Sequence, residues 1–178
     1  MILHRHGDFF SPTNFQFPLF RPFLHSFVVN GELFWGADRM FMVERALGGD
    51  AHPPRLNASP GTQTPAPVVN FYFDYSSPYA YLAATQIERT VRGAHPHASI
   101  TWTPILLGAL FKSIGTPLVP MTAASPARRQ WGARDLQAWA RYWGVPFHFP
   151  SVFPLRTVAP LRATLVCPEP RLVHALFK

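Results

Sequence analysis

Residues 71–82 read FYFDYSSPYAYL, and this stretch decides how the chain around it is organised. At its start Phe71 and Phe73 alternate with polar or amphipathic residues, which is typical of a strand with one buried face. The hydroxyl residue Ser77 then precedes Pro78, the preferred arrangement at the first turn of a helix. The stretch therefore predicts a strand over 68–74 that passes directly into a helix.

The residues that follow complete a βαβ unit. The helix is expected to continue to about Arg92, and residues 99–103 predict a second strand that ends before Pro104. Because strand, helix and strand follow within about 35 residues, we expect parallel strands joined by a right-handed crossover. The expected shared face of the helix consists of Tyr79, Leu82, Ala83 and Gln86. Further helices are predicted over 105–114, 130–143, 160–166 and 171–177.

Upstream, residues 26–49 predict a β-hairpin followed by a helix. Asn30-Gly31 lies between two apolar runs and is typical of a type I′ turn, which needs two positive φ angles. A helical pattern begins at Asp38. Its apolar positions, spaced for one face, are Met40, Val43 and Leu47.

Two further stretches predict no regular element. Residues 1–25 are rich in Phe and Pro and have no clean period, whereas residues 50–67 hold five prolines and almost no charge, as a linker does. The expected division of the chain is an irregular segment over 1–25, a hairpin–helix unit over 26–49, a linker over 50–67 and the main α/β unit over 68–178.

Composition excludes several classes of protein. Hydrophobic residues make up 48% of the 178 residues and charged residues 14%, so an intrinsically disordered chain is excluded. Cys167 is the single cysteine, which excludes an internal disulfide and a CxxC redox or zinc pair, and no metal site is expected. We find neither an apolar run of about 18 residues nor a secretion signal, so the expected location is the cytoplasm, away from membranes.

The net charge of +7 is compatible with two kinds of partner, a nucleic acid or a small anionic substrate. The basic residues do not cluster, apart from Arg128-Arg129, so nucleic-acid binding is not expected. Attraction of a small anionic substrate explains the same surplus of positive charge.

Residues 71–82 resemble the opening of the 2-hydroxychromene-2-carboxylate isomerases, glutathione-dependent relatives of the kappa-class glutathione transferases. Residues 26–40 separately resemble the last strands and final helix of the same family. The resemblance implies a thioredoxin-like α/β sheet, built from the βαβ unit and the hairpin–helix, with a partial all-helical insertion. The first of these matches continues through residues 102–108, 111–112, 139–140, 144–147, 149–150 and 153–154.

The two family segments stand in reversed order along this chain. A circular permutant, a fragment that joins the end of one gene copy to the start of the next, and a mispredicted reading frame would each produce that order. Residues 1–25 and the end of the chain within a helical pattern favour a truncated or fused product.

Ser77 is the candidate catalytic residue. In disulfide-exchanging relatives a cysteine, two residues and a second cysteine occupy this turn; here the frame reads Ser77-Pro78-Tyr79-Ala80, so disulfide exchange at this site is excluded. By resemblance, Ser77 would hydrogen-bond the sulfur of glutathione and hold it as a thiolate, which would add to a conjugated enone, allow bond rotation and leave. The alternative is that Ser77 only caps the helix. Ser76 is a weaker candidate than Ser77 for the catalytic hydroxyl.

Three further residues are implied by the resemblance as contacts of glutathione or substrate. Asp38 and Arg39 would bind the amino and carboxylate groups at the γ-glutamyl end of glutathione, and Lys112 would receive a carboxylate. The alternatives are an Asp that stabilises its helix, a solvated arginine and a surface lysine. The family's cis-proline is replaced by Leu24-His25-Ser26, so a weakened affinity for glutathione is expected.

The expected function is glutathione-dependent cis–trans isomerisation of 2-hydroxychromene-2-carboxylate type, on a small aromatic anionic substrate in aromatic degradation. The alternatives are an inactive truncated or fused fragment, a non-catalytic subunit that binds a partner, and a glutathione transferase of kappa type. A homodimer or a complementing chain would complete the sheet. Cys167 is expected to be a buried or incidental thiol rather than a nucleophile.

Overall fold

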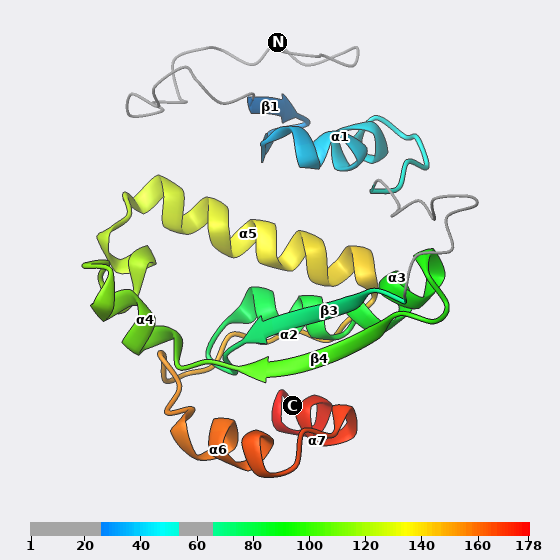
Figure 1. The fold of residues 1–178 in the computed structure, drawn as a ribbon. Helices are drawn as coiled ribbons and strands as arrows, with labels where there is room; N and C mark the ends of the chain where they lie inside the picture. Colours follow the sequence, from blue (N-terminus) through cyan, green and yellow to red (C-terminus); the bar gives the residue numbers. More distant parts are fainter. Residues whose placement is uncertain (1–25, 54–65) are drawn as a thin grey trace. The chain divides into compact units, whose positions relative to one another are not determined.

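The computed structural model describes residues 26–53 and 66–178 (Figure 1). The predictions for residues 1–25 and for most of the linker lie outside these ranges. The chain divides into two compact units, Met1–Arg55 and Leu56–Lys178, and each is described here by itself.

The first unit contains the predicted hairpin. Strand β1 (Ser26–Val29) pairs antiparallel with β2 (Glu32–Trp35). Asn30 and Gly31 between them have φ angles of 51° and 78°, which confirms the two positive values that the turn requires. The side-chain amide of Asn30 donates a hydrogen bond of 3.2 Å to the carbonyl of Ala46, so the turn is tied to the end of the following helix.

That helix differs from its prediction at the start. A 3₁₀ turn, η2 (Ala37–Arg39), precedes α1 (Met40–Ala46). Because a 3₁₀ turn winds with three residues rather than 3.6, the helical phase is shifted, and the predicted apolar stripe is wrong at its ends. Met40 is 48% exposed and Leu47 37% exposed. The buried residues are Phe41, Met42 and Val43.

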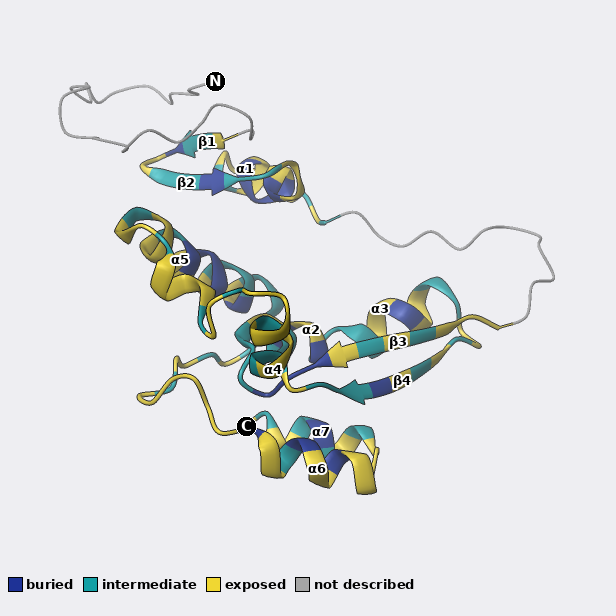
Figure 2. Cartoon of the chain, turned by 60° about the vertical axis from the view of Figure 1, so that its left-hand side comes forward, coloured by how far each residue is buried: buried dark blue, intermediate teal, exposed yellow. Residues whose placement is uncertain are grey.

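The second unit is built on two parallel strands. Strand β3 (Val68–Phe73) pairs with β4 (Ser99–Pro104) from Val68 opposite Ser99 to Phe73 opposite Pro104, which confirms the predicted βαβ unit. Burial alternates along β3, and at its end the exposed Tyr72, at 60%, is followed by the buried Phe73 (Figure 2). The helices are α2 (Pro78–Ala84), α3 (Ile87–Ala94), α4 (Leu107–Ser113), η3 (Pro120–Ala123), α5 (Pro126–Trp143), α6 (Val158–Val166) and α7 (Pro170–Leu176).

The crossover consists of two helices, α2 and α3, where the sequence predicts one. The break lies at Thr85, whose hydroxyl donates a hydrogen bond of 2.7 Å to the carbonyl of Leu82. The next amide, that of Gln86, bonds to Ala83 three residues back, so the α-helical ladder is interrupted. The predicted shared face is also wrong, because Leu82 and Ala84 are buried whereas Ala83 is exposed.

Helix α5 begins four residues earlier than the hydrophobic pattern indicates. The hydroxyl of Ser125 accepts a hydrogen bond of 3.3 Å from the backbone amide of Arg128, and Pro126 occupies the first turn. This is the same Ser-Pro start as in α2. The helix ends at Gly144, whose φ of 65° lies in the left-handed region.

The four described strands form two separate two-stranded sheets, β1–β2 and β3–β4. The hairpin sheet belongs to the first unit and the parallel sheet to the second, and the single sheet implied by the resemblance stays a prediction. Within the second unit, α5 lies on one side of β3 and β4, and α6 and α7 lie on the other (Figures 1 and 2).

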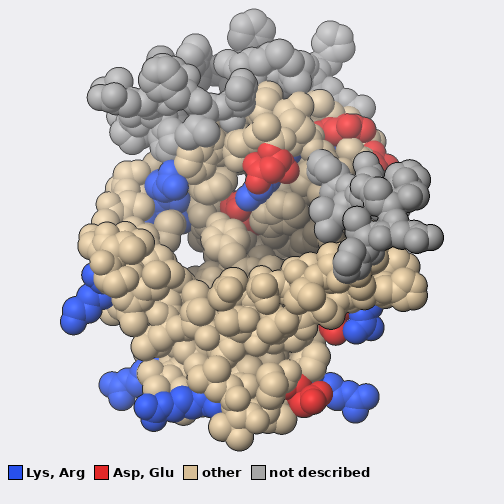
Figure 3. Space-filling view, in the orientation of Figure 1, with Lys and Arg blue, Asp and Glu red and all other residues tan. Residues whose placement is uncertain are grey.

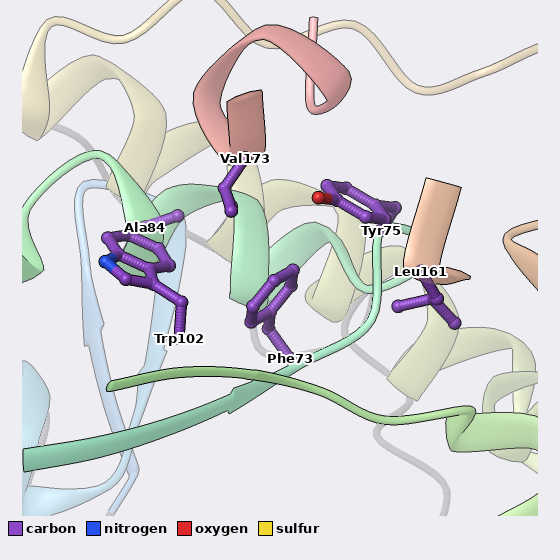
Figure 4. Close-up of a cluster of buried hydrophobic side chains, with 6 residues drawn as sticks. All are labelled: Phe73, Tyr75, Ala84, Trp102, Leu161 and Val173. Atoms are coloured by element: carbon purple, nitrogen blue, oxygen red, sulfur yellow. The ribbon is translucent and has the colours of Figure 1, made fainter. Parts of the chain in front are cut away.

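A cluster of buried aromatic and aliphatic side chains joins the last two helices to the strands (Figure 4). Phe73 lies at its centre, with ring centroids 5.3 Å from Tyr75 and 5.9 Å from Trp102, both in edge arrangements. Leu161 from α6 and Val173 from α7 pack against them. These contacts fix where α6 begins relative to the end of β3.

Tyr75 adds a polar contact to this cluster and a pH dependence to the fold. Its hydroxyl lies 2.6 Å from the hydroxyl of Thr164 on α6. Burial raises the pKa of Tyr75 above its ordinary value of 10.0, and the hydrogen bond to Thr164 opposes this shift more weakly. The folded state therefore holds the phenol proton more tightly than the unfolded chain does. The stabilisation that results is complete below pH 10 and is lost as the pH rises above it.

We therefore expect the protein to lose stability above pH 10 more steeply than its Tyr75→Phe variant, which lacks the titrating group. Urea unfolding midpoints measured from about pH 8 to pH 11 test this. Tyr81, whose pKa burial also raises, is present in both proteins and cancels in the comparison. Parallel losses in the two proteins would contradict the assignment to Tyr75.

Candidate functional site

The second unit contains a cavity of about 1210 Å³ beyond the carboxyl ends of β3 and β4. Ligands in α/β proteins commonly bind at this end of parallel strands. Its wall is formed by the turn from β3 into α2, by α4 and η3, by α5, and by the segment that leads from Phe149 into α6. Apolar residues dominate the wall, among them Leu107, Phe111, Met121, Leu136, Phe149 and Phe153.

Ser77 lies on this wall at the start of α2. Its hydroxyl oxygen accepts a hydrogen bond of 3.2 Å from the backbone amide of Ala80, and Pro78 follows it, so the prediction of a helix cap is confirmed. Accepting that bond leaves the hydroxyl with its own hydrogen to donate. Capping and donation to a ligand are therefore compatible roles for one side chain.

Ser76 also lines the cavity, and its hydroxyl links two distant parts of the chain. The oxygen accepts a hydrogen bond of 3.1 Å from the backbone amide of Leu155, 79 residues further on. This contact holds the segment before α6 against the first turn of α2. Ser76 consequently shapes the cavity from a position next to Ser77.

Asp74 is the buried carboxylate that organises this turn. It is 3% exposed. One carboxylate oxygen accepts from the amide of Ser76 at 2.9 Å, and the other accepts from the amide of Leu107 at 2.8 Å. The side chain therefore fixes the turn after β3 relative to the start of α4. Asp74 is not among the site residues predicted from the sequence, although a carboxylate directly after a strand was a signal for this role.

Three arginines line the same cavity: Arg129, Arg156 and Arg162. The sequence analysis singled out Arg129 only as part of a basic pair and missed the other two. On the face shown in Figure 3, basic side chains are scattered over the surface, and some adjoin one another near its lower edge. The three arginines give the cavity a positively charged lining.

The other predicted site residues are placed differently. Lys112 is exposed on α4 and does not line the cavity, whereas its neighbour Phe111 does. Asp38 and Arg39 belong to the first unit, where their side chains form an ion pair with each other. Ser77 is thus the predicted residue that the structure brings to the cavity, and the roles of the other three stay predictions. The backbone of the Leu24-His25 loop lies outside the described residues.

Cys167 follows α6 and is exposed, so of the two expected alternatives the buried thiol is wrong and the incidental thiol stays a prediction. It does not line the cavity. Across residues 26–53 and 66–178, no three His, Cys, Asp or Glu side chains gather as a metal site would require. No described helix is long and apolar enough to span a membrane.

The fold and this turn after β3 define a class. The family model described as the DsbA-like thioredoxin domain matches residues 68–178, more than half of the chain, and the chain belongs to that family. This confirms the thioredoxin-like α/β class. The match covers the second unit, so the reversed order of family segments and the relation of residues 26–49 to the family stay predictions.

Within this family, the chain is similar to glutathione transferases of kappa type and to an isomerase. The chain is 31% identical over 108 residues to glutathione S-transferase kappa 1 of Caenorhabditis elegans, covering 58% of this chain and 46% of that protein. It is 30% identical over 84 residues to a 2-hydroxychromene-2-carboxylate isomerase of Pseudomonas putida, covering 47% of this chain and 40% of that protein. The chain spans less than half the length of these relatives. No solved structure matches it significantly.

Proposed function

We propose that this chain binds glutathione in the cavity of its second unit and catalyses a cis–trans isomerisation of 2-hydroxychromene-2-carboxylate type. The observation that carries the proposal is the position of Ser77, which lines a large apolar cavity and whose hydroxyl has a hydrogen left to donate. Similarity to kappa-class glutathione transferases and to an isomerase supports glutathione as the second molecule.

The residues present suit glutathione. It has one thiol and two carboxylates, and it supplies a nucleophile when the thiol is ionised. Ser77 would donate its hydrogen to the sulfur, which favours the charged form and lowers the pKa of the thiol. Arg129 lies on the same wall and is a cation of the kind that pairs with a carboxylate. The apolar residues of the wall lower the local polarity around bound ligands, which would strengthen both interactions.

Isomerisation begins and ends with free glutathione, so it needs a nucleophile and a means of holding the substrate rather than a permanent acceptor. Glutathione would supply the nucleophile, with Ser77 placed to stabilise its thiolate, and the arginines of the cavity would hold the substrate. A kappa-type transferase is the second candidate. The predominantly apolar wall favours it, because such a wall accepts many hydrophobic electrophiles without specific polar contacts.

Thermal melting with and without glutathione tests the binding step. We expect millimolar glutathione to raise the melting temperature, since a ligand at a hundred times its dissociation constant adds about 2.7 kcal/mol to stability. An analogue in which a methyl group replaces the thiol should give a smaller shift, because it cannot accept the hydrogen of Ser77. A melt that glutathione leaves unchanged would contradict the proposal.

Two assays then distinguish the candidate reactions. Isomerisation of 2-hydroxychromene-2-carboxylate consumes no glutathione, whereas transfer to a chlorinated dinitrobenzene consumes one molecule per turnover. Turnover in the first assay with the glutathione concentration unchanged supports the isomerase, and turnover confined to the second supports the transferase.

A further inference from the structure

The start of helix α6 lines the same cavity as the turn that carries Ser77. Val158 and Ala159, the first two residues of this nine-residue helix, line the cavity. Backbone amides in the first turn have no partner within their own helix. Pro160 follows and has no amide hydrogen, so the first turn presents two donors, those of Val158 and Ala159.

Thr157 points to a ligand at this place. It precedes α6, is 4% exposed and lines the cavity. Its hydroxyl makes no cap hydrogen bond, and the described part of the chain contains no other partner for it. The hydroxyl oxygen is not among the fully enclosed polar atoms of the described residues, so it is still accessible to a hydrogen-bond partner. A molecule in the cavity would supply the missing partner.

Two arginines bring positive charge to the same end of the cavity. Arg156 precedes Thr157, and Arg162 lies in the second turn of α6; both line the cavity. Neither has an ion-pair or hydrogen-bond partner within residues 26–53 and 66–178. The carboxylate among the described lining residues, that of Asp74, already accepts from two backbone amides. The charge of the two arginines is therefore left for a ligand.

We propose that Arg156, Thr157, Arg162 and the first amides of α6 form a binding site for a carboxylate whose apolar body occupies the cavity. Two N–H donors, a hydroxyl and two guanidinium groups match a planar anion that accepts several hydrogen bonds. The apolar wall suits the remainder of such an acid, and a phosphate without an apolar body would leave it uncovered.

The inference rests on the proposed function for the identity of the carboxylate, which belongs either to the second substrate or to glutathione. The cavity, at about 1210 Å³, exceeds the range of roughly 300–1,000 Å³ usual for a site that holds one small ligand. Both molecules therefore have room at once, and the anion site is open to a substrate while Ser77 contacts the sulfur.

Calorimetric titration of the full chain with 4-phenylbutyrate, without glutathione, tests the site. The uncharged alcohol 4-phenylbutanol is the matched ligand. We expect the acid to bind at least about tenfold more tightly than the alcohol. We expect three variants each to lower the affinity for the acid by about three- to tenfold and to leave the affinity for the alcohol unchanged: Thr157→Val, Arg156→Gln and Arg162→Gln. Arg171→Gln on α7, which removes an exposed arginine that does not line the cavity, should change neither.

The other outcomes are equally decisive. Equal affinity for acid and alcohol, or equal loss of both in the variants, would overturn the proposal. Thr157→Ser keeps the hydroxyl and should retain the affinity of the parent, which separates a lost hydrogen bond from a damaged fold. The same variants titrated with glutathione identify the source of the carboxylate. If they lose affinity for glutathione as well as for the acid, the site is assigned to glutathione; if their affinity for glutathione is unchanged, it is assigned to the second substrate. Unchanged affinity for the acid in all three variants would overturn the proposal. Because the acid is titrated without glutathione, the test of the anion site is valid even if the protein does not bind glutathione.

Discussion

Ser77→Ala is expected to lower glutathione-dependent turnover by about 10²–10³-fold, the usual cost of removing one donor from a charge-stabilising site. The variant loses the hydroxyl that faces the cavity and keeps the apolar wall. Without this donor the bound thiol is less readily ionised, so its pKa rises towards the value for a free thiol. The activity lost at neutral pH should therefore be partly regained at higher pH.

The same substitution removes a helix cap, so stability needs its own control. Replacing a capping serine by alanine costs about 1 kcal/mol. Ser125 provides the matched case, because it caps α5 through the amide of Arg128, precedes a proline and does not line the cavity. Ser125→Ala should lose similar stability and keep its activity. Equal activity losses in the two variants would show that Ser77 acts through the fold alone.

The ultraviolet absorbance of the bound thiolate gives an independent reading of the thiol. Titrated in wild type and in Ser77→Ala, it should show a higher pKa in the variant. Ser76→Ala is a second comparison, because that hydroxyl lines the same cavity but accepts from Leu155. A higher thiol pKa in Ser76→Ala, together with a wild-type pKa in Ser77→Ala, would show that Ser76 and not Ser77 is the donor.

Short-range signals predicted most of the secondary structure. Asn30-Gly31 and Ser77-Pro78 define a turn and a helix start through their own backbone preferences, and both are present. The errors occur where a neighbouring contact competes with hydrophobic periodicity. At Thr85 a side chain bonds to the backbone of its own helix and ends it. Periodicity alone does not contain that competition.

The sequence predicted the part of the candidate site around Ser77 but not the part formed by the segment that leads into α6. Ser77 could be found because its position follows from a strand-to-helix turn that is contiguous in sequence. Arg156, Thr157 and Arg162 reach the cavity because the segment before α6 folds back on that turn, where Leu155 donates to Ser76. The two residues of this bond are 79 positions apart. Such a contact depends on tertiary packing, and no local pattern marks it.

Phe73→Ala is expected to destabilise the second unit by about 3–5 kcal/mol, the usual cost of removing a buried phenylalanine. Phe73 is 1% exposed and packs against aromatic rings and against α6 and α7. Natural domains are stable by only about 5–15 kcal/mol, so this loss is a large fraction of the total. Urea unfolding followed by tryptophan fluorescence reports it, since Trp102 lies against the phenyl ring.

Tyr72→Ala is the matched control, because this neighbour lies on the opposite face of β3 and is 60% exposed. Its effect should stay within about 0.5 kcal/mol. A similar loss in both variants would contradict the packing described here. The core and the anion site are also linked: Leu161 packs α6 against Phe73, Thr157 precedes this helix and Arg162 follows Leu161 in it. Phe73→Ala should therefore lower the affinity for 4-phenylbutyrate even at temperatures where the second unit is still folded, whereas Tyr72→Ala should leave that affinity unchanged.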